Sequence, residues 1–233
     1  TNLVREKLVQ ATQVLQELDL DLWLLMARES DVIGDPSLPL VVGTSVTWES
    51  AFLISRTGEH TAIVGTGDVE NIRQTGAWEH VVGYVEGVSR PLLQALERYD
   101  PRTIALNYSR DDVLADGLTY GLYLLLQDIL APTPYWSRIV SGEDVARRVR
   151  GRKSPEEQRR LCQAVATTLE IWDALRAWLR PGLTEREIAA FMHRQVRERG
   201  LETAWDPHYC PTVTAGPDSP VGHVGPTDIT IQR

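Results

Sequence analysis

The first part of the chain carries apolar residues at two different spacings, and each spacing predicts a different element. In residues 2–18 the apolar positions recur at steps of three and four, which places them on one face of an amphipathic helix. These positions are Val4, Leu8, Ala11, Leu15 and Leu18. The run LDLWLLM at residues 20–26 is apolar almost throughout, and it predicts a buried strand.

Helix and strand patterns continue to alternate after this point. AFLISRTGEHTAIVG, residues 51–65, predicts two strands around a turn at Arg56–Glu59, where Gly58 supplies a permissive backbone. The other predicted elements are strands at HVVGYV (80–85) and TIALNY (103–108), and helices at residues 68–75, 89–99 and 115–130. This alternation predicts an α/β domain with a mixed sheet between helices.

The pattern changes near Ser141, and two long capped helices are predicted beyond it. Residues 154–179 begin with SPEE, in which Ser154 caps the helix and Glu157 completes a capping box. Residues 184–199 begin with a second box, TERE, and Gly200 ends the helix. The apolar stripe of the first helix consists of Leu161, Val165, Leu169, Trp172, Leu175 and Leu179. These changes predict one domain over residues 1–150 and another over residues 151–233.

Composition narrows the class of protein. Hydrophobic residues make up 42% of the chain and charged residues 24%, which allows a sizeable core in one or two domains. The net charge of −8 argues against a nucleic-acid or anionic-membrane partner. The basic stretch at residues 147–160 contains no aromatic residues that could stack bases, so it predicts a solvated connector or helix start rather than a polyanion site.

Cysteine content and hydropathy bear on the compartment. Two cysteines, Cys162 and Cys210, are too few for a disulfide scaffold and favour a reducing, cytoplasmic location. The opening residues TNLVREKLVQ lack the apolar core of a signal peptide. No apolar run approaches the roughly 18 residues of a membrane span. We therefore expect a cytoplasmic protein without a membrane partner.

Two short patterns are incomplete as functional motifs. VGTGDVE, residues 64–70, follows a strand and precedes a helix, but Glu70 stands where a dinucleotide-binding loop has its third glycine. GTSVT around Ser45 has threonine where a nucleophile elbow has its second glycine. Dinucleotide binding and serine hydrolase chemistry are therefore disfavoured.

Asp206, His208 and Cys210 alternate, and on a strand they would share one face and could bind zinc, with His223 as a fourth ligand. Prolines beside them disfavour a regular strand, so ordinary side chains of an irregular segment are the favoured interpretation. Three other histidines have no catalytic neighbour in the sequence and are predicted to be structural or exposed. They are His60, His80 and His193.

The segment CPTVTAGPDSPVGH, residues 210–223, ends in a histidine with a different setting. Glycines and prolines surround His223, so the backbone has little tendency to form regular structure. Glycines beside a histidine allow a ligand to approach closely, and imidazole groups in general can donate to a carbonyl or shuttle a proton near neutral pH. From the residues alone, His223 is either a functional group or an ordinary loop histidine.

Two blocks of the sequence resemble a known family. RGRKSPEEQRRLCQAVATTLEIWDALRAWLRPGLTEREIAA, residues 150–190, is similar to the opening of the pita-bread metallopeptidases, which include Xaa-Pro aminopeptidase, prolidase, methionine aminopeptidase and creatinase. TAGPDSPVGH is similar to the G-x-N-x-x-x-x-H segment that follows in these proteins, with Gly216, Asp218 and His223 in the matching places. Asp218 replaces the commoner asparagine.

The resemblance extends in outline to the rest of the chain. Residues 1–150 resemble the creatinase-type N-terminal domain, with its opening helix and the LDLWLLM strand. The N-Y-L-T-G segment of that domain is not evident, and LVVGTSVTWESAF, residues 40–52, stands in its place. The implied fold is an α/β creatinase-like domain with a mixed sheet, followed by the first part of an α+β pita-bread domain.

The resemblance implies a catalytic role for His223, beside a metal centre in the peptidases and as a proton-transfer base in creatinase. It also implies two divalent ions (Mn, Co or Zn), held by two aspartates, a histidine and two glutamates. These ligands are expected after Arg233, so no residue of this chain is assigned as a metal ligand. A chain cut before them is expected to be inactive alone. It is also expected to expose the apolar face of residues 154–179 and the DITIQR strand, which would pair with the remainder of the polypeptide or with another copy.

The function implied is that of the N-terminal portion of a metal-dependent aminopeptidase or dipeptidase that acts on peptides or dipeptides, with Xaa-Pro specificity as one option. A homodimer is expected by analogy with the family. Two alternatives stay open at this point. One is a metal-free amidinohydrolase of the creatinase type that uses His223 as its base, and the other is a non-catalytic relative kept for binding or dimerisation.

Overall fold

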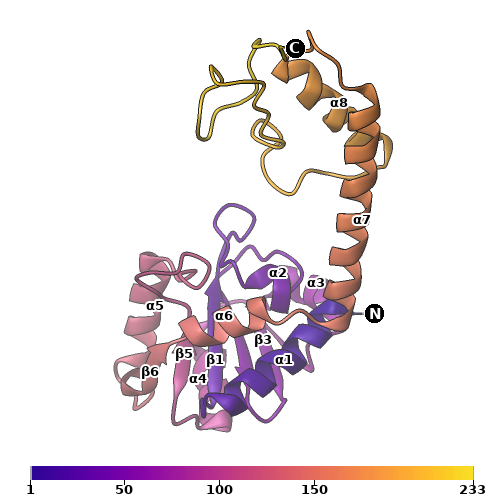
Figure 1. Ribbon diagram of the computed structural model, residues 1–233. Helices are drawn as coiled ribbons and strands as arrows, with labels where there is room; N and C mark the ends of the chain where they lie inside the picture. The colour runs from indigo at the N-terminus through magenta and orange to yellow at the C-terminus, as the bar shows by residue number, and fades with distance from the viewer. Residues whose placement is uncertain (1, 233) are drawn as a thin grey trace. The chain divides into compact units, whose positions relative to one another are not determined.

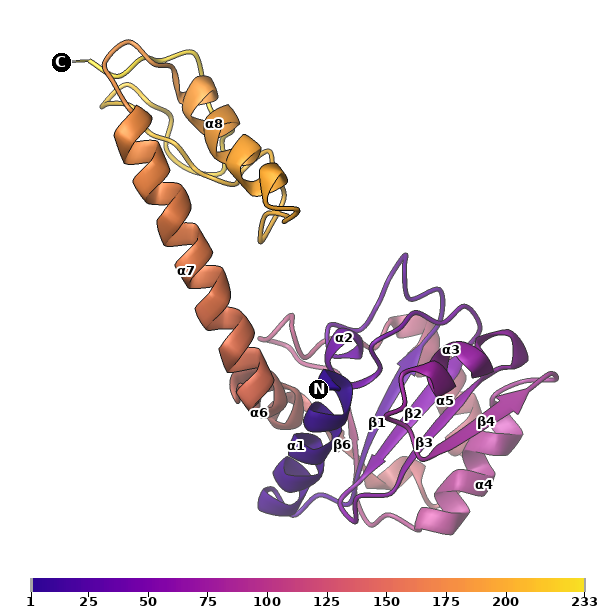
Figure 2. The same cartoon turned by 90° about the vertical axis from the view of Figure 1, so that its right-hand side faces the viewer.

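The computed structural model describes residues 2–232 (Figures 1 and 2). The chain divides into two compact units, the first extending to Gln158 and the second starting at Arg159. This division falls inside helix α7 (Pro155–Trp178). The boundary predicted between residues 150 and 151 stays a proposal about domains.

A six-stranded mixed sheet forms the centre of the first unit. Its strand order is β4-β3-β2-β1-β5-β6. The strands are β1 (Leu22–Ala27), β2 (Ser50–Ser55), β3 (His60–Gly65), β4 (His80–Tyr84), β5 (Ile104–Leu106) and β6 (Ile139–Ser141). β1, β2 and β3 pair antiparallel, whereas β1 with β5, β3 with β4, and β5 with β6 pair parallel. The predicted mixed sheet is confirmed.

Helices cover both faces of this sheet, so the first unit has three layers (Figure 2). Its helices are α1 (Leu3–Glu17), α2 (Leu38–Val41), α3 (Val69–Gln74), α4 (Ser89–Tyr99), α5 (Tyr120–Leu130) and α6 (Glu143–Gly151). Apolar residues of α1 and α6 share one core with one face of the sheet. Those of α4 and α5 share a second core with the opposite face.

Strand β1 shows why the run LDLWLLM is apolar throughout. Trp23 and Leu25 point into the core beneath α1 and α6, while Leu22 and Leu24 point into the core beneath α4 and α5. None of these four side chains is more than 1% exposed. A central strand with helices on both faces needs apolar residues at every position, and the prediction of a buried strand is confirmed.

Helix α5 starts five residues later than the predicted helix at 115–130. The Thr119 side chain accepts from the backbone amide of Leu122 and caps the helix there. Residue Leu118 instead donates its amide to the carbonyl of Asn107, 2.9 Å away. This contact with another loop is made through the backbone, so the apolar pattern could not reveal it.

Helix α6 lies where the sequence predicts only a solvated connector or helix start. Its three buried residues, Val145, Ala146 and Val149, pack onto the sheet. The arginines on its other side bind acidic residues, with Arg147 paired to Glu143. Only three residues of this helix are apolar and buried, and the basic residues that follow Ala146 dominate the sequence pattern. Helix α2 and strand β6 were also not predicted.

A buried lysine connects α1 to the start of α7. Lys7 is fully buried, and its ammonium group donates to the carbonyls of Val149 and Arg152, each 2.7 Å away. It also forms an ion pair with Glu157 at 2.6 Å. Glu157 in turn accepts from the amide of Ser154, which confirms the predicted capping box. The ammonium group of Lys7 therefore joins α1 to the end of α6 and the start of α7.

The second unit has a small core between α7 and α8 (Glu185–Glu198). Leu175, Leu183, Ile188 and Phe191 form this core, and the Phe191 ring stacks on Trp178 with centroids 4.6 Å apart. The chain then returns, and residues 227–231 hydrogen-bond to the backbone of residues 182–186. The expected strand at DITIQR is limited to a single antiparallel bridge between Thr184 and Thr230.

The predicted apolar stripe on α7 is mostly exposed. Leu175 is buried in the second unit's core, but the other five residues are 44–59% exposed. They are Leu161, Val165, Leu169, Trp172 and Leu179. The expected exposure of this face is confirmed, and rows of large apolar residues on a surface mark contact sites. Within residues 2–232, no helix combines the length and apolar character that crossing a bilayer requires.

Candidate functional site

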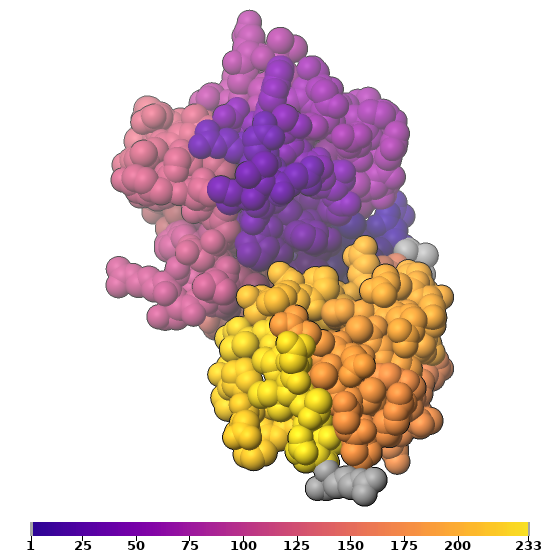
Figure 3. All heavy atoms as spheres, turned by 90° about the horizontal axis from the view of Figure 1, so that it is seen from above, coloured from indigo at the N-terminus to yellow at the C-terminus, as the bar shows by residue number. Residues whose placement is uncertain are grey.

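The candidate site is the irregular segment that follows α8. Residues 201–229 form neither a helix nor a strand, and they return beside α7 and α8 to the bridge at Thr230. Figure 3 shows this segment, in yellow, against the orange residues of the same unit. Its position depends on side-chain contacts because it lacks a backbone ladder of its own.

Glu185, the first residue of α8, makes the most extensive of these contacts. Its side chain is 1% exposed. One carboxylate oxygen accepts from the Ala215 amide at 3.0 Å and from the Ser219 hydroxyl at 2.5 Å. The other oxygen accepts from the amide and the hydroxyl of Thr227, at 2.9 and 2.6 Å. A single carboxylate thus connects two distant parts of the segment.

The Ser219 hydroxyl extends this network. Its oxygen accepts from the amides of Ala215 and Gly216, at 3.1 and 3.2 Å, while its proton is donated to Glu185. The Ser219 amide donates to the carbonyl of Gly216 at 3.2 Å. The turn at residues 215–219 is therefore closed on itself and attached to α8.

A second contact from α8 fixes the start of the segment. His193 Nε2 lies 2.6 Å from the carbonyl oxygen of Cys210. At the other end, the exposed side chains of Arg186 and Asp228 form an ion pair at 3.1 Å. Helix α8 therefore holds the segment near its beginning, its middle and its end.

His223 lies between the two parts that Glu185 connects, on the exposed portion of the segment. Gly222, just before it, has a φ of +115°, a conformation that residues with a Cβ rarely adopt. Among residues 2–232 the structure records no hydrogen bond or ion pair of the His223 ring. An exposed ring without a protein partner is free to meet a ligand, and its catalytic role stays a prediction.

The neighbouring motif positions differ in their surroundings. Gly216 belongs to the turn closed by Ser219, whereas Asp218 is exposed. Gly225 lies against the ring of His208, and an added Cβ would come within 2.7 Å of His208 Nε2. Glycine at residue 225 therefore allows two parts of the segment to touch.

The other histidines have structural surroundings. His60 is buried with its ring centroid 6.3 Å from that of Trp78, and burial lowers the pKa of His60 because it disfavours the charged form. His80 pairs with Glu59 at 2.9 Å. With the His193 contact above, these positions agree with the prediction of structural or exposed roles.

No three His, Cys, Asp or Glu side chains come together as a possible metal site anywhere in residues 2–232. This includes Asp206, His208 and Cys210, which lie in the irregular segment and not on a strand. The donor set that two divalent ions would need is therefore not supplied by the described residues, and no chemical step is assigned to a metal here.

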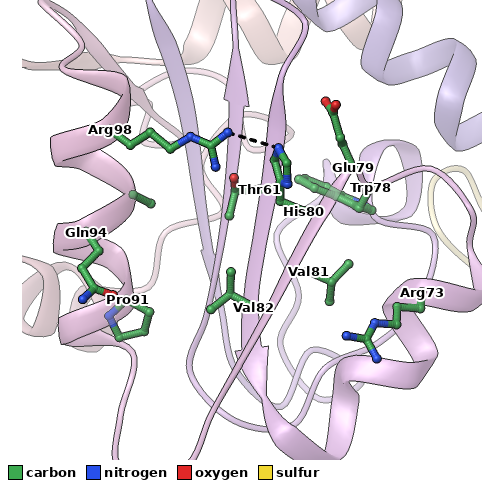
Figure 4. A pocket seen from close by; sticks show the side chains of 11 residues that line it. Thr61, Arg73, Trp78, Glu79, His80, Val81, Val82, Pro91, Gln94 and Arg98 are labelled. Carbon is green, nitrogen blue, oxygen red and sulfur yellow. Dashed lines mark hydrogen bonds between the residues drawn. The ribbon is translucent and has the colours of Figure 1, made fainter.

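Three hollows of the described surface lie in the first unit. One of about 550 Å³ lies beside the edge strand β4, with Arg98 of α4 on one side and Arg73 of α3 on the other (Figure 4). Arg98 pairs with Glu59, which also binds His80, so much of the charge there is neutralised locally. Two further hollows, of about 260 and 530 Å³, also belong to the first unit. His223 lines none of the three.

Sequence reasoning missed Glu185. The TERE motif was interpreted as a capping box between Thr184 and Glu187, and that box is confirmed, with the Thr184 hydroxyl accepting from the Glu187 amide at 3.1 Å. Glu185, however, shares one helix face with the buried residues Ile188 and Ala189. An acidic residue on an apolar stripe requires buried hydrogen-bond donors, and this spacing is the signal that could have found it.

The Glu185 contacts predict a response to acid. Burial alone would raise the pKa of Glu185, but the hydrogen bonds from Ser219, Thr227 and Ala215 outweigh it and lower the pKa from 4.5 to about 2. A lowered pKa in the folded state stabilises that state above pH 4.5, and this stabilisation is lost as the pH falls towards 2. We expect the hydrogen-exchange protection factors of the Ala215 and Thr227 amides to fall over this range.

The matched control is Glu185→Gln, measured by the same exchange experiment. It should lower both protection factors at neutral pH and remove most of their dependence on pH between 4.5 and 2. Other carboxyl groups, including Glu187, titrate nearby, so a pH dependence equal in the variant and the original protein would contradict the assignment to Glu185.

A family model matches the part of the chain that contains this segment. Residues 148–233 match the model of metallopeptidase family M24, so the match includes α7, α8 and the segment with His223. A search of curated proteins found no match.

Solved structures share the fold along almost the whole chain. A Xaa-Pro dipeptidase from Bacillus anthracis aligns with a TM-score of 0.63 and 16% identity, covering 98% of this chain and 58% of its own. The prolidase from Pyrococcus horikoshii aligns with a TM-score of 0.61 and 20% identity, covering 98% and 58%. The dipeptidase PepE from Mycobacterium ulcerans gives 0.60 and 19%, covering 99% and 57%.

The chain thus spans about 58% of the length of the first two of these proteins. Its fold, a creatinase-like α/β domain followed by part of a pita-bread domain, is the predicted one. The resemblance stated from the sequence is confirmed to this extent: residues 148–233 match the model of metallopeptidase family M24, and the chain shares the fold of solved Xaa-Pro peptidases over almost its whole length.

Proposed function

We propose that this chain is the N-terminal portion of a metal-dependent aminopeptidase or dipeptidase that hydrolyses a peptide bond with an activated water. The observation that carries the proposal is the match of residues 148–233 to metallopeptidase family M24. The matched region includes the segment that α8 holds through Glu185 and His193, so the structured part of the proposed site belongs to it.

His223 is the proposed catalytic residue of this chain. It sits on an exposed turn after Gly222, where an imidazole can donate to a substrate carbonyl or to the oxyanion formed from it. Divalent ions, if bound by ligands outside this chain, would supply the activated water and polarise the carbonyl. Manganese, cobalt and zinc are all compatible with that role.

Substrate and assembly are further parts of the proposal. The named structural neighbours include a Xaa-Pro dipeptidase and a prolidase, which supports testing Xaa-Pro dipeptides first. We also propose that the exposed stripe of α7 packs against the remainder of a longer polypeptide, since the structural neighbours extend well beyond the region shared with this chain. A cytoplasmic homodimer completes the proposal.

The experiment is an assay of the complete polypeptide on Ala-Pro and Ala-Ala dipeptides, before and after removal of metal by a chelator. We expect hydrolysis that is lost after chelation and restored by manganese, with Ala-Pro preferred. Hydrolysis of guanidino compounds that survives chelation would instead indicate an amidinohydrolase. A stable protein that hydrolyses neither substrate class would indicate a binding or dimerisation relative.

A further inference from the structure

We propose that Glu185 is the positioning residue for His223, because its carboxylate holds both ends of the loop that carries the imidazole. The catalytic consequence rests on the proposed function, whereas the positioning itself can be measured without any substrate. Glu185 does not touch the ring and acts only through the loop at residues 219–227.

The loop is symmetric about His223. Ser219 lies four residues before it and Thr227 four residues after it. The Ser219 hydroxyl donates to one carboxylate oxygen at 2.5 Å, and the Thr227 amide and hydroxyl donate to the other at 2.9 and 2.6 Å. The two ends of the loop are therefore bound to the same carboxylate group.

This arrangement restricts both ends of the loop, in addition to the close approach of His208 to Gly225. The His223 ring has no recorded hydrogen bond or ion pair among residues 2–232. Gly222, just before it, has a φ of +115° and no side chain that could pack against a neighbour. A glycine-containing loop with free ends would sample many conformations, and fixing each of its residues costs conformational entropy. Fixing both ends through one buried group reduces the conformations open to the imidazole.

The chemistry of the Glu185 hydrogen bonds suits a loop held in one position. Hydrogen bonds to an ionised carboxylate are roughly twice as strong as those between neutral groups. Glu185 occupies the first turn of α8, where the helix dipole favours negative charge. Because the carboxylate is 1% exposed, water cannot readily replace Ser219 or Thr227. Loss of Ser219 would leave one buried oxygen with the Ala215 amide alone, and loss of the Thr227 contacts would leave the other without a recorded donor in residues 2–232.

Glu185→Gln separates this role from folding. The amide group of glutamine is neutral and keeps only one acceptor oxygen, so it binds the backbone amide at one end of the loop more weakly and does not accept from the amide at the other end. Backbone contacts of the same region do not depend on the side chain, since the Glu185 amide donates to the Ile229 carbonyl and the Arg186 amide to the Thr227 carbonyl, each at 3.1 Å. The variant is therefore expected to fold.

Glu187→Gln is the matched control, since Glu187 lies in the same helical turn and hydrogen-bonds only to Thr184 among the recorded partners of its side chain in residues 2–232. Both variants are made in the complete polypeptide. Two properties are measured without substrate: hydrogen exchange of the Ser219–Thr227 amides, and the NMR signals of imidazoles labelled with ¹⁵N.

We expect Glu185→Gln to increase exchange of the Thr227 amide at least about tenfold and to shift or broaden the His223 ring signals, while the His193 signals stay unchanged. Glu187→Gln should leave the loop as it is. If Glu185→Gln folds and both the loop exchange and the His223 signals are unchanged, the positioning role is wrong.

Turnover then tests the dependence on the proposed function. When the loop is released in Glu185→Gln, kcat on the preferred dipeptide should fall about tenfold to 100-fold, with a smaller change in KM. Displacing a catalytic group by a small distance lowers the rate by this order. The pH profile of kcat/KM should shift as well, which a loss of stability alone would not produce. If the loop is released without any loss of turnover, the result would support the positioning of the loop by Glu185 and contradict a catalytic role for His223.

Discussion

Replacing His223 by alanine is expected to lower kcat of the complete polypeptide on its preferred dipeptide by about 10²- to 10⁴-fold. An imidazole that donates to the developing oxyanion, or moves a proton, contributes on this scale. The ring is exposed and has no recorded hydrogen bond or ion pair among residues 2–232, so its removal should change the free energy of unfolding by less than about 0.5 kcal/mol. His223→Ala should therefore lower kcat strongly and leave the free energy of unfolding almost unchanged.

Steady-state kinetics and thermal unfolding of the same samples measure both effects. His80→Ala is a suitable control, because His80 belongs to the first unit and pairs with Glu59. It should retain the original turnover. If His223→Ala also retains it, His223 is an ordinary loop histidine, which is the alternative that the residues alone leave open.

Replacing Lys7 by methionine is expected to lower the free energy of unfolding by about 3–5 kcal/mol. This is the usual loss when one partner of a buried ion pair is removed. The ammonium group is fully buried and satisfies two carbonyls and the Glu157 carboxylate. Methionine fills a similar volume but donates no hydrogen bonds. The variant therefore leaves a carboxylate without its cation and the carbonyls of Val149 and Arg152 without their donor.

Urea denaturation followed by circular dichroism measures this loss. Lys153→Met is the control, since Lys153 is exposed and donates only to the Arg150 carbonyl among the contacts recorded in residues 2–232. It should change stability by no more than about 0.5 kcal/mol. Adding Glu157→Gln to Lys7→Met should recover part of the loss, because it removes the unpaired charge. Equal losses in Lys7→Met and Lys153→Met would show that the buried pair does not stabilise this junction.

The sequence determined by itself the elements whose information is local. The opening helix follows from apolar spacing over a few turns, and α4 was predicted with the bounds that the structure has. The capping boxes at Ser154 and Thr184 involve residues three apart, and both are present. The motif around His223 indicated the resemblance to the metallopeptidases but gave no information on what surrounds the ring.

Only the tertiary structure decided the contacts between distant residues. Helix α6 is identified by three apolar side chains that pack onto the sheet. Lys7 donates hydrogen bonds to carbonyls more than 140 residues away in the sequence. In the sequence, Glu185 is one of two acidic residues in the first turn of a helix. In the structure it accepts hydrogen bonds from residues 30 to 42 positions later in the chain. Periodicity reports which face of an element is apolar. It does not report which distant group completes the hydrogen bonds of a buried charge, because that partner is selected by the path of the folded chain.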